Sequence, residues 1–90
     1  MAGSNTGLSN MAAYWVYILR CRGGSLYTGI ATDVRRRFQE HVAGIGAKYT
    51  RSHPPKKIVY QQQFKTRSAA LKREIQIKNL TRKEKLKLVG

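Results

Sequence analysis

A run of aromatic and β-branched side chains at residues 14–19 (YWVYIL) constrains the fold of this chain more than any other segment. Such residues favour a pleated strand. Residues 22–25 (RGGS) have the composition of a turn, and residues 26–30 (LYTGI) follow as a second strand-like run. Two strands joined by a short glycine-containing turn form a β-hairpin. The sequence therefore predicts an antiparallel hairpin near the start of the folded part.

Helical spacing follows the predicted hairpin. Residues 34–42 carry apolar side chains at intervals of four, and Thr32 or Asp33 can cap the first turn of a helix there. The side chains expected to face the core are Val34, Phe38 and Val42. Glycines and a proline pair in residues 44–57 favour irregular structure. We therefore expect a helix over residues 34–42 and a loop over residues 44–57.

The last third of the chain indicates one strand and two helices. Residues 58–64 (IVYQQQF) are typical of a strand, and Thr66 or Ser68 can start a helix after it. The side chains expected on the apolar face of that helix are Leu71, Ile75 and Ile77. Residues 81–84 (TRKE) match a capping box, which predicts a short helix ending near Val89. The order β-β-α-β-α-α predicts a small α+β domain.

The chain has 90 residues, which is enough for one hydrophobic core only. Residues 1–12 are rich in Gly, Ser, Asn and Thr and offer little to bury. They are expected to form a disordered leader or a remnant added before the natural start, for which Met11 is a candidate. Residues 13–90 are expected to form a single domain.

The charge of the chain points to a polyanionic partner. Lys and Arg number 18 against 4 Asp and Glu, which gives a net charge of +14. A domain of this size is not expected to keep such self-repulsion for solubility alone, so nucleic acid is the first candidate partner. Its binding should weaken steeply with salt because counterions are released. The side chains expected to contact it are Arg35, Lys48, Tyr49, Arg51, Lys72 and Lys78. The alternative is a generally basic surface without a defined site.

Several classes of protein are disfavoured by what the sequence lacks. Cys21 is the single cysteine, so an intramolecular disulfide and a cysteine-based zinc site are excluded. No apolar run approaches the roughly 20 residues that cross a bilayer, and no membrane association is expected. No Lys or Arg precedes Arg20, so the positive start of a secretory signal is missing. We expect a cytoplasmic protein that uses no small-molecule cofactor and holds any metal through oxygen ligands.

Five polar side chains suggest phosphodiester chemistry. Glu74 could hold Mg²⁺, which often takes a single protein carboxylate together with water. Arg37 could stabilise a phosphate in the transition state, and Tyr17 or Tyr27 could act as base if nearby cations lower its pKa. His41 lies one turn after Arg37 on the same helix edge. Each residue also has a structural alternative: packing for the tyrosines and the histidine, a solvated charge for Arg37 and a salt bridge for Glu74.

These residues resemble the GIY-YIG nuclease family. Its two short motifs correspond to residues 16–18 (VYI) and 27–29 (YTG), and Arg37, His41 and Glu74 follow at the family's spacing. The resemblance covers about residues 13 to 88 and is most similar to the small, stand-alone bacterial branch, which carries no appended targeting domain. Two motif positions differ from the family pattern, Val16 for Gly and Thr28 for Ile. Both are packing positions, so the chemistry is not affected.

The resemblance implies a three-stranded antiparallel sheet flanked by helices and hydrolysis of DNA with one Mg²⁺ or Mn²⁺ ion. It implies Tyr17 as general base and Tyr27 as the residue that orients the water or the scissile phosphate. Arg37 would stabilise the transition state, His41 would assist through a hydrogen bond that could go to Tyr17, and Glu74 would hold the metal. Two further positions that it implies are Gly29, for close passage of the backbone, and Asn79, for substrate binding.

The length of the hairpin loop tests this interpretation. Side chains alternate across a strand, so a two-residue loop would place Tyr17 and Tyr27 on opposite faces. A three-residue loop would pair Tyr27 with Cys21 or Leu19 and place both tyrosines on one face. The catalytic interpretation therefore predicts a three-residue or bulged loop, which adjacent glycines permit.

The expected substrate is single-stranded, branched or otherwise distorted DNA, because the domain is small and lacks a groove-reading motif. DNA and RNA are not distinguished by phosphate contacts alone. The first alternative is a non-catalytic nucleic-acid-binding module on the same fold. The second is a component of a DNA repair assembly in which a protein partner supplies specificity.

Overall fold

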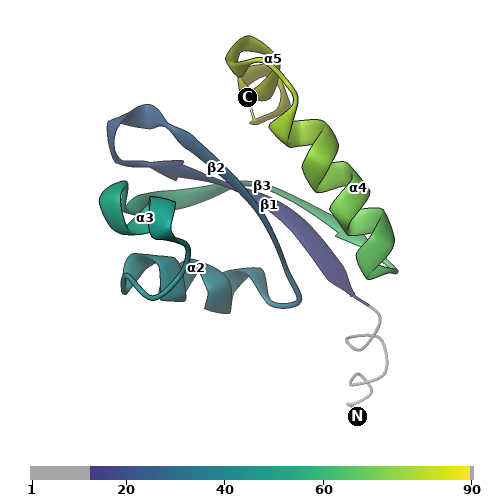
Figure 1. Ribbon diagram of the computed structural model, residues 1–90, viewed down its shortest axis with the longest axis horizontal. Helices are drawn as coiled ribbons and strands as arrows, with labels where there is room; N and C mark the ends of the chain where they lie inside the picture. Colours follow the sequence, from purple (N-terminus) through teal and green to yellow (C-terminus); the bar gives the residue numbers. More distant parts are fainter. Residues whose placement is uncertain (1–12, 90) are drawn as a thin grey trace.

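A computed structural model of the chain describes residues 13–89, and the leader expected at residues 1–12 lies outside them. The α+β fold with a three-stranded antiparallel sheet is confirmed, with strand order β2-β1-β3 (Figure 1). The elements are β1 (Tyr14–Cys21), β2 (Leu26–Ala31), α2 (Val34–Val42), α3 (Lys48–Ser52), β3 (Pro55–Phe64), α4 (Arg67–Lys78) and α5 (Arg82–Val89). None of the helices in this part of the chain is long and apolar enough to cross a membrane.

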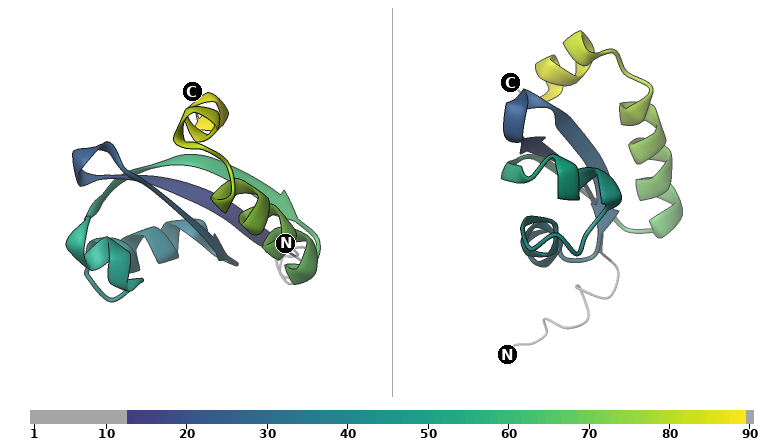
Figure 2. Two further views of the ribbon diagram at one scale, coloured as in Figure 1. Left: turned by 45° about the horizontal axis from the view of Figure 1, so that its top comes forward. Right: turned by 60° about the vertical axis from the view of Figure 1, so that its left-hand side comes forward.

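The sheet separates two layers of helices. In Figure 2, α2 and α3 lie on one side of the sheet and α4 on the other. β1 is the central strand and is buried on both faces, because alternate side chains point to opposite layers. Val16 and Ile18 pack with Ala70 and Ile77 of α4. The other core cluster, on the α2 side, is Tyr17, Leu19, Cys21 and Val34.

The hairpin closes through a three-residue loop, as the catalytic interpretation predicted. Residues 22–24 form one turn of 3-10 helix, and the Cys21 N–H donates to the Ser25 carbonyl at 2.8 Å. Gly23 and Gly24 adopt φ of 85° and 90°, a region that other residues rarely occupy. Tyr27 consequently pairs with Leu19, and Tyr17 and Tyr27 share a face of the sheet.

The helix starts follow the predicted capping residues. The Asp33 carboxylate accepts from the Arg36 N–H at 3.1 Å and starts α2, and the Thr66 hydroxyl accepts from the Ala69 N–H at 3.1 Å and starts α4. The capping box at residues 81–84 is formed in both directions, with separations of 2.8 and 3.2 Å. These local hydrogen bonds fix where each helix enters the fold.

Two predicted core residues are wrong, for the same reason. Val42 is 56% exposed and Ile75 is 58% exposed. α2 is rotated so that His41 faces the interior, and α4 is rotated so that Ala70, Glu74 and Ile77 face the sheet. In α2 the buried line continues from Val34 to His41, seven positions later, and not to Val42, eight positions later. In α4 it continues from Ala70 to Ile77, also seven positions later, whereas Ile75 lies on the opposite side of the helix.

The loop expected over residues 44–57 contains regular structure. α3 forms a short helix within it, and β3 begins at Pro55, three residues earlier than predicted. α3 is anchored by Thr50, which is buried and donates to the Ala47 carbonyl at 2.9 Å. Pro55 is tolerated because it is the first residue of an edge strand. Glycine and proline content alone therefore overstated the irregularity of this segment.

Candidate active site

The two tyrosines lie together over the edge strand β2. Tyr17 on β1 is paired with Gly29 on β2, and a Cβ atom at Gly29 would overlap the Tyr17 phenol. The Tyr17 side chain therefore lies across β2 because position 29 has no side chain. Tyr27 is two residues earlier on the same face, and the two ring centroids are 6.4 Å apart. The role expected for Gly29, close passage of the backbone beside the site, has this physical basis.

Gly29→Ala is expected to destabilise the fold by about 1–3 kcal/mol, the usual cost of overfilling a packed interior. The reason is that the new methyl group and the Tyr17 ring would need the same space. Urea unfolding would measure the loss. In a Tyr17→Leu background the same substitution should cost much less, because the conflicting ring is gone. An equal cost in both backgrounds would contradict the explanation.

His41 is fully buried, and both of its ring nitrogens have partners. Nε2 lies 2.9 Å from the Tyr17 hydroxyl, and Nδ1 lies 2.7 Å from the Thr50 hydroxyl. A Cβ atom at Gly46 would overlap the ring, so the glycine makes room for it. Burial lowers the pKa of His41, and the nearby Arg37 charge lowers it further. His41 is therefore a neutral imidazole at neutral pH, and its contact with Tyr17 is the one that the family resemblance allowed.

The Tyr17 hydroxyl is harder to ionise than the sequence suggested. Burial raises the pKa of Tyr17 to about 12, Tyr27 and Glu74 add to the rise, and Arg37 opposes it. The expectation that neighbouring cations lower this pKa is therefore wrong for the protein alone, because burial outweighs the guanidinium. Tyr17 is a neutral phenol at pH 7. The Tyr17 hydroxyl can accept a proton from water only if it donates its own proton to another group.

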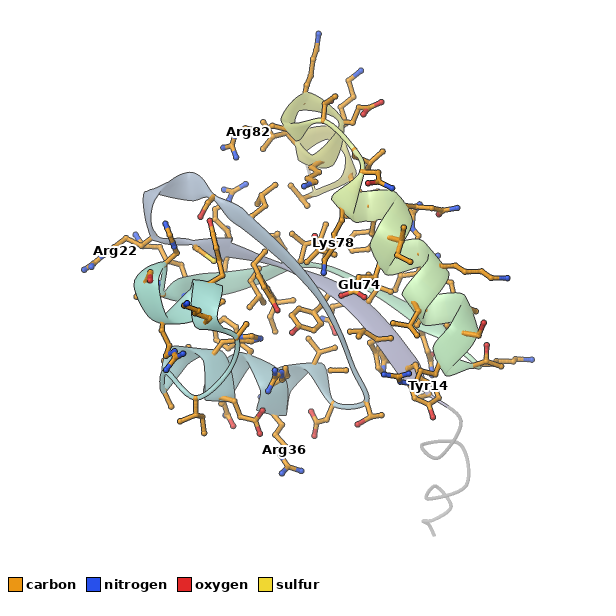
Figure 3. The ribbon with its side chains drawn as sticks, in the orientation of Figure 1. Tyr14, Arg22, Arg36, Glu74, Lys78 and Arg82 are labelled. Carbon is orange, nitrogen blue, oxygen red and sulfur yellow. The ribbon has the colours of Figure 1, made fainter. Side chains whose placement is uncertain are left out.

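Arg37 is held beside this pair by an acidic neighbour. Its Nη1 donates to Glu40 Oε1 at 2.8 Å, and its side chain is 37% exposed. Its positive charge lowers the pKa of both Tyr17 and His41, so the guanidinium lies close to both side chains. Figure 3 shows the neighbouring Arg36 pointing away from the sheet. Glu40 was not among the predicted site residues, although its spacing of three from Arg37 on one helix was a usable signal.

Glu74 approaches from the opposite layer. It lies on the inner line of α4, its side chain is only 14% exposed, and its Oε2 lies 3.2 Å from Lys78 Nζ (Figure 3). Its negative charge contributes to the raised pKa of Tyr17, so the carboxylate acts on the tyrosine site. The structure thus groups Tyr17, Tyr27, Arg37 and His41 on the α2 side of the sheet, with Glu74 close enough on the α4 side for its charge to act on Tyr17.

The donor set fits a hard divalent cation. Glu74 supplies one nearly buried carboxylate that already holds a cationic group, the Lys78 ammonium. Among residues 13–89 there is no cluster of three or more His, Cys, Asp and Glu side chains that could form a full protein cage for a metal. A single carboxylate completed by water and substrate oxygens is typical of Mg²⁺, whereas structural zinc requires more protein ligands.

The predicted nucleic-acid contacts are only partly grouped. Lys48, Tyr49 and Arg51 are exposed together on α3, and Lys78 and Asn79 are exposed at the end of α4. Tyr49 is stacked with His53 at a centroid separation of 4.3 Å and lies nearly parallel to Tyr27 at the larger separation of 6.0 Å. His53 was not predicted as part of this stack.

Two predicted contacts lie apart from that group. Arg35 borders a separate hollow of about 520 Å³ beside Trp15. Lys72 is exposed, and the helical repeat places it on the outer side of α4, away from the Glu74 line.

A pocket of about 260 Å³ connects α3 to α4 across the edge of β2. It is lined by Leu26, Tyr27, Thr28, Tyr49, Lys78 and Lys85. Its lining thus combines aromatic and apolar groups with two lysine side chains. Tyr27 belongs to both this pocket and the tyrosine pair, so the pocket adjoins the candidate catalytic residues.

The chain is similar to a known family and to several bacterial proteins. The GIY-YIG catalytic domain family matches residues 13–87. A UPF0213 protein of Staphylococcus saprophyticus is 49% identical over 80 residues, which cover 89% of this chain and 98% of that protein. A UPF0213 protein of Cupriavidus necator is 53% identical over 78 residues, 87% of this chain and 85% of that protein. The solution structure of a UPF0213 protein of Bacillus halodurans is similar with a TM-score of 0.56 and 44% identity, covering 86% of this chain and 82% of that one. The chain therefore belongs to the GIY-YIG family, a nuclease-type family, and is similar to its small bacterial UPF0213 members.

Proposed function

We propose that the protein is a metal-dependent endonuclease that hydrolyses phosphodiester bonds in single-stranded or distorted DNA. The observation that carries this proposal is the buried Tyr17–His41 pair with the Arg37 guanidinium on one side and the Glu74 carboxylate close enough on the other to act on Tyr17. A binding module would need the surface charge but not a buried tyrosine–histidine pair beside a nearly buried carboxylate. We further propose that it acts in the cytoplasm, in DNA repair, where a protein partner could supply specificity.

Each residue of the site has a separate role in the proposed hydrolysis. Arg37 would hold a non-bridging phosphate oxygen and stabilise the charge that grows there in the transition state. The oxygen of a water molecule forms a bond to phosphorus while the bond from phosphorus to the leaving sugar oxygen breaks. Tyr17 takes the proton of that water, and Tyr27 orients the water or the phosphate.

Glu74 would hold one Mg²⁺ or Mn²⁺ ion. When bound, the ion would polarise the phosphate and stabilise the leaving oxygen. The Lys78 ammonium, which contacts Glu74 in the protein alone, would then be free to contact the DNA backbone.

The pocket that Tyr27 and Tyr49 line together supports an unpaired substrate. Aromatic rings stack on any exposed base, and the cations Lys78 and Lys85 in the pocket lining can neutralise the adjoining phosphates. A base can enter such a pocket only when it is released from its partner strand. We therefore assign single-stranded or distorted DNA as the preferred substrate, with one base held next to the bond that is cut.

Tyr49→Leu is expected to weaken the binding of single-stranded DNA about 5- to 150-fold, since one base stack contributes about 1–3 kcal/mol. Tyr49→Phe keeps the ring and should bind within a few-fold of the unaltered protein. Fluorescence anisotropy with a labelled oligonucleotide, measured without Mg²⁺, would compare the two. Equal dissociation constants for the Leu and Phe variants would show that the ring does not stack on a base.

The activity itself is tested with labelled single-stranded, duplex and branched DNA and with single-stranded RNA, each incubated with Mg²⁺ or with a chelator. We expect cleavage of single-stranded or branched DNA that requires Mg²⁺ and stops when the metal is removed. Salt-sensitive binding without cleavage of any substrate would instead establish the non-catalytic module. Preferential cleavage of RNA would contradict the proposed substrate class while retaining the chemistry.

A further inference from the structure

Three buried side chains and one carbonyl group form a continuous hydrogen-bonded chain beneath the candidate active site. The Tyr17 hydroxyl contacts His41 Nε2 at 2.9 Å, and His41 Nδ1 contacts the Thr50 hydroxyl at 2.7 Å. The Thr50 hydroxyl contacts the Ala47 carbonyl at 2.9 Å. Tyr17, His41 and Thr50 are each no more than 1% exposed, so water does not compete for these bonds.

The carbonyl at the end of this chain determines its direction. A carbonyl oxygen can only accept, so the single hydroxyl proton of Thr50 is donated to Ala47. The Thr50 oxygen must then accept from His41, which places the imidazole proton on Nδ1. One other donor competes for Nδ1, the Ala47 N–H, but at 3.4 Å it lies beyond the usual range for such a bond. Nε2 is left with a free lone pair, and Tyr17 donates to it.

We propose that Thr50 is a positioning residue that holds His41 in the Nδ1–H tautomer, so that His41 Nε2 can receive the proton of Tyr17. The inference rests on the proposed hydrolytic function and concerns a residue on α3 that neither the motifs nor the spacing singled out. Thr50 does not contact the reacting atoms. It acts through His41, in the way that a partner of one ring nitrogen fixes the tautomer of a functional histidine.

This tautomer explains how a tyrosine with a high pKa can serve as base. The water proton moves to the Tyr17 oxygen while the Tyr17 proton moves to His41 Nε2, and the imidazolium that results keeps its Nδ1–H bond to Thr50. The leaving sugar oxygen takes a proton from solvent and His41 later returns its proton to solvent, so the protons balance and no free phenolate forms. In the opposite tautomer, Nε2–H would point at the Tyr17 oxygen. Tyr17 would then have to direct its own proton toward the water and could not accept one while neutral.

The tautomer can be observed directly, because imidazole ¹⁵N chemical shifts in a long-range ¹H–¹⁵N spectrum distinguish a protonated ring nitrogen from an unprotonated one. We expect the Nδ1–H form of His41 in the unaltered protein and in Thr50→Ser, which keeps the hydroxyl. Thr50→Val keeps the shape but removes the acceptor, and should shift His41 to the Nε2–H form. An Nε2–H form in the unaltered protein would overturn the proposal. So would an unchanged tautomer in a folded Thr50→Val variant.

Turnover supplies the second measurement. Thr50→Val should lower kcat for single-stranded DNA about 10–100-fold, the range known for partners of metal-binding histidines, and leave KM nearly unchanged. Thr50→Ser should recover most of the activity. A tautomer shift without loss of kcat would refute the role of Thr50 in the reaction. If no substrate is cleaved at all, the proposed function fails, whereas the assignment of the tautomer is still decided by the spectrum. Should Thr50→Val not fold, the unaltered protein and Thr50→Ser decide it.

Discussion

Arg37→Ala should lower kcat for single-stranded DNA about 10²–10³-fold, the usual cost of removing one group that stabilises transition-state charge. The guanidinium is half-exposed, fixed by Glu40 at 2.8 Å and close enough to act on the pKa of Tyr17 and His41. It is therefore already in place before DNA binds. The measurement is single-turnover cleavage at saturating DNA with Mg²⁺.

Arg35→Ala is the matched comparison for this prediction. It removes the same charge from the same helix, but Arg35 is exposed and borders a hollow away from the tyrosine pair. Its loss should weaken DNA binding slightly and reduce the slope of the logarithm of the binding constant against the logarithm of salt concentration by about one. The rate of single-turnover cleavage should stay within a few-fold of that of the unaltered protein. Comparable cleavage rates for the two variants would remove Arg37 from its assigned role.

Glu74→Gln is expected to abolish Mg²⁺-dependent cleavage, since it replaces the one carboxylate proposed to hold the ion with a neutral group of the same shape. DNA binding should persist or become slightly tighter. The reason is that the variant carries one more net positive charge and leaves Lys78 without its partner at 3.2 Å. Cleavage assays and anisotropy on one protein preparation would separate the two effects.

Glu84→Gln provides the control for charge. It changes the net charge equally, but Glu84 is exposed at the start of α5, where it accepts from the Thr81 N–H at 2.8 Å. We expect a small loss of stability from the weaker helix cap and normal cleavage. Equal activity in Glu74→Gln and Glu84→Gln would exclude Glu74 as the metal ligand. Circular dichroism of both variants would confirm that any loss of activity occurs in a folded protein.

The elements of the fold were largely predictable because their signals are local. The aromatic run of β1, the capping side chains of Asp33 and Thr66 and the capping box of residues 81–84 all work within a few residues of chain. α3 was missed because five residues carry too weak a helical pattern, and its stability comes from burying Thr50. Long-range contacts, not propensity, decided that segment.

The rotation of the helices could not be derived from apolar spacing. Val42 and Ile75 are better hydrophobic residues than His41 and Glu74, yet the structure turns the polar pair inward. Burial of a polar ring is costly unless each nitrogen has a partner. Those partners, Tyr17 and Thr50, come from other elements and lie 24 and nine residues away along the chain.

The fold class, the family and the five side chains expected to perform the chemistry could all be predicted from strand patterns, caps and motif spacing, because these signals depend on residues close together in the chain. How those side chains are held depends on contacts between distant elements: Gly29 beneath the Tyr17 ring, the neutral His41 between Tyr17 and Thr50, and Lys78 beside Glu74. The physical reason is that the burial of a side chain and the direction of its hydrogen bonds depend on which atoms of distant elements come into contact. Those contacts cannot be predicted from patterns of neighbouring residues.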